Sequence, residues 1–343
     1  MRTDIGTRSR TAVILAAVVA LLAGPAAGPA RADPGGSRAA SPVAGSVVGS
    51  AVLKAYPKHG QRSAAVRALQ ERLVGADLMR AQHRTGYFGN TTKAAVPTLQ
   101  RRYKLDPTGR VDAATTAALT GAVRAMTGPA TWYHRQSIGT SAEGRPIMAY
   151  RAGQAGRPVV VVLATMHGEE DFGQYVARGL LEGRKIRGVD LWVVPVVNPD
   201  GFVRDRRWVS SQVDLNRNFP HRFIIRANSG PRASSAKETR VMTAFLNRTR
   251  PRYLVSWHQP LIGVDSYAVK DKALMKRLSK GLRIPVRRLD CHGSCHGTMT
   301  GWFNARHRGA AITVEYGVEA RSTKTMKVRD ANAVLAAVGG RRA

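Results

Sequence analysis

Four short apolar runs mark the C-terminal part of the chain. They read RPVVVVLATM, VDLWVVPVV, RYLVSW and AAITVEYG, and segments of helical length separate them. Each run is apolar along its whole length instead of at alternate positions, which is typical of strands buried on both faces. The pattern predicts an α/β domain with a mixed, mostly parallel sheet covered by helices.

A helical pattern precedes these runs. Apolar residues recur there at helical spacing in two groups, which are Val66, Leu69 and Leu73, then Val96, Leu99 and Tyr103. The turn DPTGRVD leads to a last short helix with Leu119. These segments predict a small all-α domain of three helices over residues 56–121. Pro97 lies inside the second helix, and we expect it to bend or restart that helix.

The first residues have the layout of an export signal. Arg2, Arg8 and Arg10 precede the apolar run TAVILAAVVALLAG, which is short for a membrane span. The small residues of ARA follow, and they suit cleavage after Ala32. We therefore expect residues 1–32 to be a removable signal peptide, with no stable membrane span after cleavage. A retained membrane anchor is the alternative.

Two segments without helical or strand periodicity separate the predicted parts. Residues 33–55 are rich in Gly, Ser, Ala and Pro, which predicts a flexible linker. Residues 122–130 form a second linker, which contains the sequence TGPA. The α/β domain is then expected over residues 131–338.

The charge of the chain limits the classes of partner that it is expected to bind. It has 54 Lys+Arg against 22 Asp+Glu, a formal net charge of +32. Such an excess favours polyanions, whether nucleic acid, anionic lipid or an acidic cell wall. An exported protein does not meet chromosomal DNA. We therefore expect anionic cell-wall polymers as partners, no nucleic acid, and a secreted or wall-associated location in a bacterial envelope.

Four polar side chains lie at the ends of the apolar runs. His167 and Glu170 follow the first run, His258 ends the third, and Glu315 lies in the fourth. Ligands of open α/β sheets bind beyond the carboxyl ends of the strands. A catalytic zinc takes three protein ligands, and two His with one Glu are a common set. We predict one zinc ion per chain, held by His167, Glu170 and His258.

A carboxylate beside a zinc-bound water is the next requirement. Zinc lowers the pKa of its water, and a general base then takes the proton. We assign this role to Glu315. The alternative is that Glu315 is a buried acid paired with an arginine. Glu169 is one residue out of phase with the His167 and Glu170 pair, so we expect its side chain to point elsewhere.

The two cysteines lie four residues apart in DCHGSCHGT. In an oxidising compartment, a tight turn allows a disulfide between Cys291 and Cys295. Two alternatives stay open at this point. One is a compact metal site that uses both thiols with His292 and His296, and the other is a pair of free thiols.

The helical part carries a motif of its own. The layout V..LQ..L, then G.FG..T..AV..LQ, then L…G.VD..T...L resembles the peptidoglycan-binding domain of cell-wall hydrolases over residues 56–121. The resemblance implies peptidoglycan as a partner. A small helical bundle without a ligand is the alternative.

The α/β part resembles the carboxypeptidase A-type zinc peptidases over residues 131–338. HGEE, VDLNRNFP, SWH and EYG occur in the order of that family, and IGTSAEGRPI resembles its entry segment. The resemblance implies that Asn216 and Arg217 bind a substrate carboxylate, for which a planar guanidinium is suited. It also implies that Arg207 stabilises the developing oxyanion, with Arg204 or Arg206 as alternatives.

The sequence departs from the digestive members of this family. They carry a Tyr on a loop over the site, whereas the matching interval here reads CHGSCHGTMTGWFN. A shorter, more open site resembles that of the murein peptide amidases, which cut the γ-D-glutamyl–diaminopimelate bond of stem peptides. We therefore expect an exported zinc peptidase that acts on peptidoglycan stem peptides. The alternatives are a carboxypeptidase that removes C-terminal residues, a zinc amidase that cuts between muramic acid and L-alanine, and a non-catalytic wall-binding protein.

Overall fold

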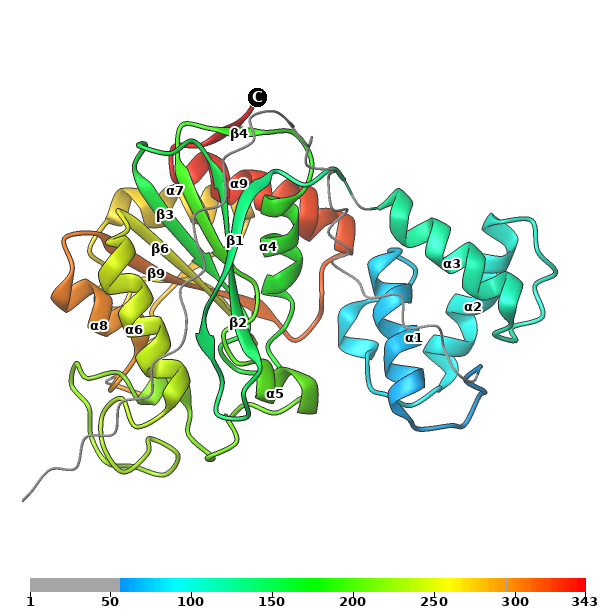
Figure 1. Ribbon diagram of the computed structural model, residues 1–343, viewed down its shortest axis with the longest axis horizontal. Coiled ribbons are helices and arrows are strands. Elements are labelled where there is room, and N and C mark those ends of the chain that lie inside the picture. Colours follow the sequence, from blue (N-terminus) through cyan, green and yellow to red (C-terminus); the bar gives the residue numbers. More distant parts are fainter. Residues whose placement is uncertain (1–55, 127, 294) are drawn as a thin grey trace, which may run out of the picture. The chain divides into compact units, whose positions relative to one another are not determined.

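The computed structural model describes residues 56–126, 128–293 and 295–343 (Figure 1). The predicted signal peptide at 1–32 and the linker at 33–55 lie outside these residues. Among the described residues, the helices are too short or too polar to cross a membrane.

The helical region contains the three predicted α-helices and one short 3₁₀ turn. Their bounds are α1 Ala64–Gly75, η1 Ala81–His83, α2 Asn90–Arg102 and α3 Ala113–Ala125. Polar side chains cap the N-termini of α1 and α3. Ser63 Oγ accepts a hydrogen bond from Val66 N–H, and Asp112 Oδ1 accepts one from Thr115 N–H. The expectation of a small all-α domain with three helices is confirmed.

The predicted restart at Pro97 is wrong, because α2 continues through this residue without interruption. Val96 and Leu99 are fully buried on either side of it. The proline removes one backbone hydrogen bond. Burial of the neighbouring apolar side chains holds the helix together despite that loss.

Two buried glutamines fix the turns between these helices in the same way. Gln70 donates to the backbone carbonyl of Tyr87 and accepts from Gly86 N–H at 2.8 Å. Gln100 donates to the carbonyl of Arg110 and accepts from Gly109 N–H at 2.9 Å. Each amide also donates to a threonine hydroxyl at the start of the following helix. The two LQ motifs therefore hold two equivalent glycine turns.

The second region is built on an eight-stranded sheet with the strand order β1-β2-β5-β3-β6-β9-β7-β8. The four central strands, β5, β3, β6 and β9, run parallel. The pairs β1–β2, β2–β5 and β9–β7 are antiparallel. The bounds are β1 Trp132–Thr140, β2 Pro146–Gly153, β3 Val159–Leu163, β5 Asp190–Val194, β6 Tyr253–His258, β7 Leu261–Asp265, β8 Val286–Arg287 and β9 Ala310–Gly317.

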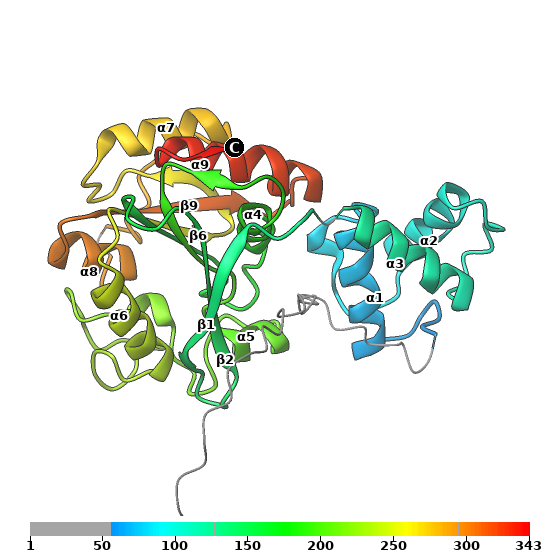
Figure 2. The ribbon, with the colours of Figure 1, turned by 45° about the horizontal axis from the view of Figure 1, so that its top comes forward.

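Helices cover both faces of this sheet, as Figures 1 and 2 show. Val160 and Val162 of β3 belong to one buried cluster together with α4, α7 and α9. Val161 and Leu163 belong to another, together with α6 and α8. The remaining bounds are α4 Gly173–Leu181, β4 Ile186–Arg187, α5 Pro199–Arg204, η2 Leu215–Arg217, α6 Lys237–Thr249, α7 Lys272–Leu282, α8 Met299–Arg306, η3 Thr325–Asp330, α9 Ala331–Ala337 and β10 Arg341–Arg342.

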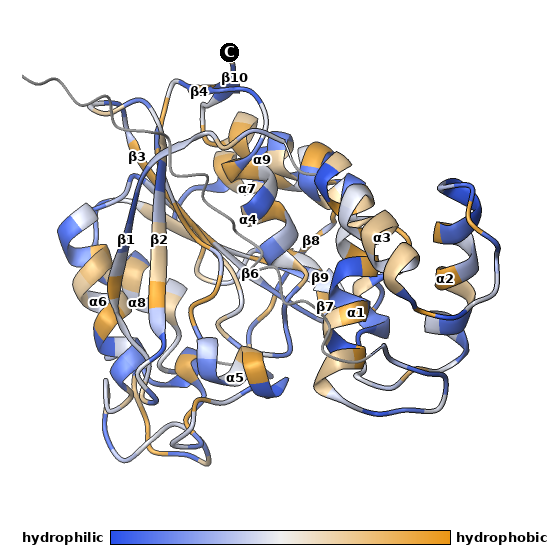
Figure 3. Cartoon of the chain, turned by 45° about the vertical axis from the view of Figure 1, so that its right-hand side comes forward, coloured by the Kyte–Doolittle hydropathy of each residue, from blue (hydrophilic) through white to orange (hydrophobic). Residues whose placement is uncertain are grey.

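The predicted mixed, mostly parallel α/β sheet is confirmed, and the four apolar runs form its four central strands. The other strands have no such signature. In Figure 3, β1 is largely hydrophilic beside the more hydrophobic β2. Most of the β1 side chains are exposed or half-buried, which explains why its sequence does not read as a buried strand.

Candidate metal and active site

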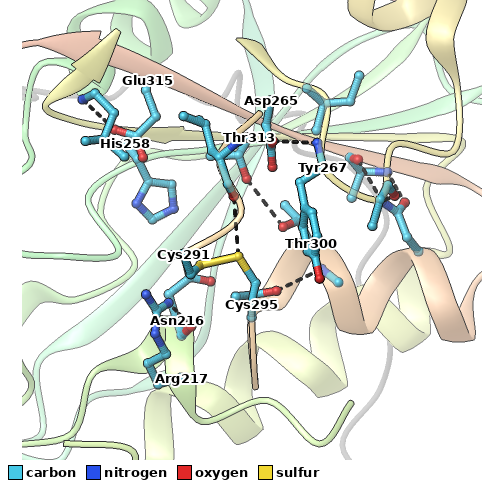
Figure 4. Close-up of a pocket in the computed structure, with 18 of the residues that line it drawn as sticks. Asn216, Arg217, His258, Asp265, Tyr267, Cys291, Cys295, Thr300, Thr313 and Glu315 are labelled. Atoms are coloured by element: carbon cyan, nitrogen blue, oxygen red, sulfur yellow. Dashed lines mark hydrogen bonds between the residues drawn. A yellow bond between two sulfur atoms is a disulfide. The ribbon is translucent and has the colours of Figure 1, made fainter. Parts of the chain in front are cut away.

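The site lies at the carboxyl ends of the central parallel strands. His258 is the last residue of β6, and it pairs in register with Glu315 of β9. His167 and Glu170 lie in the turn between β3 and α4. Parallel pairing therefore brings side chains from three strand ends to one edge of the sheet. Figure 4 shows His258 and Glu315 on one side of the cavity, with Asn216 and Arg217 below them.

The turn that carries His167 and Glu170 is fixed by close backbone packing. Gly168 donates its N–H to the carbonyl of Arg206 at 3.0 Å. A Cβ atom at Gly168 would lie 2.0 Å from the carbonyl carbon of Gly201, so no larger residue fits there. Glycine at this position thus permits the turn that places the two side chains together.

The three predicted ligands converge. His167 Nδ1 lies 2.8 Å from Glu170 Oε1, and His258 Nδ1 lies 2.8 Å from Glu170 Oε2. All three side chains are buried, and one nitrogen or oxygen of each lies within 4.8 Å of the others. His167 Nδ1 makes no hydrogen bond of good geometry despite its burial. Two imidazole nitrogens and a carboxylate aimed at one point are a donor set that fits zinc.

The electrostatics of the cluster favour a cation. Burial lowers the pKa of His167, but the charges of Glu170 and Asp214 outweigh this effect and raise it to about 9. Burial raises the pKa of Glu170, yet the two histidines bring it well below its usual range. The Glu170 carboxylate therefore stays negatively charged although it is buried.

Asp214 holds His167 in place, a role that the sequence alone does not predict. Its Oδ1 lies 2.9 Å from His167 Nε2 and accepts from Asn216 N–H at 2.8 Å. Arg207 Nε donates to its Oδ2 at 3.0 Å. A carboxylate on the far nitrogen fixes the tautomer that leaves Nδ1 free for a metal. The signal was available, because Asp214 is the acid in the motif VDLNRNFP.

Of the three arginines considered for the oxyanion, only Arg207 lines the cavity. Its Nη1 donates to Glu170 Oε1 at 2.8 Å. Arg204 is exposed and pairs with Glu143, and Arg206 is exposed as well. Glu169 does not line the cavity.

Asn216 and Arg217 lie across the cavity from Glu315. Asn216 Oδ1 accepts from Met299 N–H at 3.0 Å, which ties this residue to the start of α8. Arg217 Nη1 donates to the carbonyl of Asn216 at 2.8 Å. Both residues are half-buried and line the cavity. An arginine there presents a positive charge to an anionic group of a ligand.

Glu315 is a buried acid without an arginine partner. It has no ion pair within 4 Å among the described residues, and its Oε2 accepts from Leu261 N–H at 3.2 Å. Burial raises the pKa of Glu315, and the charge of His258 opposes this shift. A carboxylate with a raised pKa is a better proton acceptor than an ordinary surface acid. The geometry therefore does not support the alternative, in which Glu315 is a structural acid paired with an arginine.

All seven predicted metal, catalytic and substrate residues line one cavity of about 530 Å³. Cys291 and Cys295 also line it, and they are joined by a disulfide. The alternatives of free thiols and of a cysteine metal site are therefore wrong. The disulfide loop lies in the interval where the digestive carboxypeptidases carry their tyrosine.

Comparison with known proteins agrees with this geometry. The zinc carboxypeptidase model matches residues 127–260, and the peptidoglycan-binding domain model matches residues 62–119. Murein peptide amidase A of Vibrio campbellii is 28% identical over 196 residues, which cover 52% of this chain and 77% of that protein. The Escherichia coli K12 protein of the same name is 30% identical over 168 residues, covering 44% of this chain and 69% of its own.

The chain belongs to the zinc carboxypeptidase family. The crystal structure of carboxypeptidase A from Helicoverpa armigera has the same fold, with a TM-score of 0.50 at 16% identity; the match covers 66% of this chain and 71% of that one. The protein is thus a zinc metallopeptidase, and zinc is its cofactor. The family resemblance inferred from HGEE, VDLNRNFP, SWH and EYG is confirmed.

Proposed function

We propose that the protein hydrolyses a peptide bond in peptidoglycan stem peptides, and that this bond joins γ-D-glutamate to diaminopimelate. The observation that carries the proposal is the presence, in one chain, of the peptidoglycan-binding domain and the zinc peptidase site. The names of the murein peptide amidase relatives point to the same substrate.

Each residue of the cavity has a role in this reaction. Zinc bound by His167, Glu170 and His258 would lower the pKa of a water molecule and polarise the substrate carbonyl. Glu315 accepts the proton of the attacking water and delivers it to the leaving nitrogen. Arg207 has N–H groups beside the metal ligands and stabilises negative charge on the carbonyl oxygen.

Asn216 and Arg217 bind the free carboxylate of the residue that leaves. A guanidinium in a half-buried cavity can make a bidentate contact with that planar anion. This contact orients the scissile bond toward Glu315, which lies on the opposite side of the cavity (Figure 4). The roles of Asn216 and Arg217 therefore belong to binding, and that of Glu315 to chemistry.

We also propose the domain organisation and location. Residues 1–32 direct export, residues 33–55 and 122–130 are linkers, residues 56–121 bind the wall, and residues 131–338 carry the peptidase. The net charge of +32 supports contact with anionic wall polymers.

Digestion of purified muropeptides, with product masses read by mass spectrometry, tests the proposed function. A cut between γ-D-glutamate and diaminopimelate releases diaminopimelate from a tripeptide and a diaminopimelate-containing dipeptide from a tetrapeptide. Removal of only the terminal residue from every substrate would instead indicate an ordinary carboxypeptidase. Absence of any zinc-dependent product would overturn the proposal in favour of wall binding alone.

A further inference from the structure

A second hollow, of about 600 Å³, lies at the edge of the sheet opposite the metal site. Its lining includes Tyr253 and Ala310, the first residues of β6 and β9. The metal ligand His258 is the last residue of β6, five steps farther along the strand, which is roughly 17 Å. None of the residues assigned to the metal, the base or the substrate lines this second hollow.

The lining of this hollow is strongly basic. Its cationic residues are Arg252, Lys270, Lys272 and Arg308. Asp271 also lines it, but its Oδ1 is engaged in accepting a hydrogen bond from Leu274 N–H at 2.7 Å, at the start of α7. In the described part of the chain, none of the four cations has a carboxylate partner within 4 Å. The chain therefore supplies this basic hollow with no direct countercharge.

Three segments that are distant in sequence meet at the basic hollow, and backbone packing holds them together. Ala310 N–H donates to the carbonyl of Arg252 at 2.9 Å. A Cβ atom at Gly309 would lie 2.0 Å from a backbone oxygen of the facing segment, so this close approach requires glycine. Lys270 Nζ donates to the carbonyl of His307. The basic hollow is thus a product of the fold and not of one local run of charge.

The cations of the hollow are close enough to affect their surroundings. Burial lowers the pKa of His307, and the charges of Lys270 and Arg250 lower it further. Lys272 is the first residue of α7, where a positive charge opposes the helix dipole. Like charges also repel one another. An anionic ligand would remove both of these unfavourable effects.

The lining favours one class of anionic partner. Its aromatic residue, Tyr253, is only 7% exposed and lies under the Arg252 guanidinium at 5.2 Å, so no open ring is available to stack on a nucleic-acid base. Its aliphatic residues, Val269 and Ala310, are half-buried and buried, so the hollow offers no side chain for insertion into a lipid bilayer. Guanidinium and ammonium groups suit phosphate oxygens. A flexible chain of phosphodiesters fits a concave surface of this kind.

We propose that the basic hollow binds a phosphodiester-linked polyol polymer of the cell wall, and so anchors the peptidase region while its catalytic cavity stays open. This inference rests on the proposed wall location but not on the bond that the enzyme cuts. The competing interpretation is that the four cations are only part of a generally basic surface, since the chain has 54 Lys+Arg.

Lys272→Gln combined with Arg308→Gln tests the proposal, because both side chains line the hollow and are exposed. Arg184→Gln combined with Arg187→Gln is the matched control, since it removes the same charge from two exposed arginines outside the hollow. Isothermal titration calorimetry with soluble poly(glycerol phosphate) at about 0.15 M salt measures the dissociation constant. It should rise by about 10- to 30-fold in the Lys272→Gln, Arg308→Gln variant and by less than about twofold in the control. Hydrolysis of soluble muropeptides should be unchanged in both.

The outcomes separate the two interpretations. Equal weakening in both double variants would show that overall charge binds the polymer, and would overturn the proposal. Wild-type affinity for poly-L-glutamate, a single-stranded oligonucleotide or phosphatidylglycerol vesicles that equals or exceeds that for poly(glycerol phosphate) would overturn it as well. A loss confined to the Lys272→Gln, Arg308→Gln variant, at an unchanged unfolding temperature, supports it. If no muropeptide is cut but the polymer binds in this way, the proposed function fails while the basic hollow stands as a binding site.

Discussion

Substitution of Asp214 by Asn should weaken zinc binding, although Asp214 is not itself a metal ligand. The Asp214 carboxylate makes three contacts, to His167 Nε2 at 2.9 Å, to the backbone N–H of Asn216 at 2.8 Å and to Arg207 Nε at 3.0 Å. Asparagine has the same shape but no charge, so it polarises the imidazole less and no longer requires one tautomer. Loss of such a partner typically costs 10- to 100-fold in metal affinity or activity. We expect the zinc dissociation constant to rise by that factor.

Competition with a fluorescent zinc chelator at fixed pH measures this constant directly. His258→Ala serves as the reference for loss of a true ligand, and it should lose most of the zinc. Glu319→Gln changes the charge by the same amount at an exposed position outside the cavity, so it controls for the general field of the protein. Zinc affinity of Asp214→Asn within twofold of the wild type would refute the argument that this carboxylate positions His167.

Three further results are expected. Glu315→Gln should keep stoichiometric zinc, measured by metal analysis, while hydrolysis falls by about 10²- to 10⁴-fold; substantial turnover would move the base role to another acid. Replacing Cys291 and Cys295 together by Ser should raise KM more than it lowers kcat, because their loop lines the cavity, and equal kinetics would show that the loop is not needed for binding. Raising salt from about 0.05 to 0.5 M should weaken binding to whole cell walls, as judged by sedimentation, because the Debye length shortens several-fold; unchanged binding would mean that charge does not anchor the protein.

The sequence predicts the four central strands and the three metal ligands for the same reason. Strands buried on both faces are continuously apolar, so β3, β5, β6 and β9 are visible without any knowledge of their partners. His167, Glu170 and His258 then stand out as polar residues at strand ends. The family motifs add Asn216 and Arg217, and these lie in the same cavity.

The features that were missed depend on pairing that no local pattern reveals. β1 is polar because its side chains are mostly exposed or half-buried, and it belongs to the sheet only through its antiparallel pairing with β2. Asp265 enters the cavity because β7 pairs with β9 in one particular register. Asp214 lies within the motif VDLNRNFP, yet its role becomes visible only through the 2.9 Å contact to His167.

The origin of the metal ligands in separate strands has a consequence for how the protein matures. Glu170 and His258 are 88 residues apart in the chain and meet only when β3 and β6 pair. An unfolded chain therefore offers zinc little more than the local pair of His167 and Glu170. Contacts between residues so distant in sequence form slowly, because a long loop must close before they gain any energy. Tight zinc binding should thus report completed folding, and added metal should slow unfolding more than it accelerates the early steps of folding.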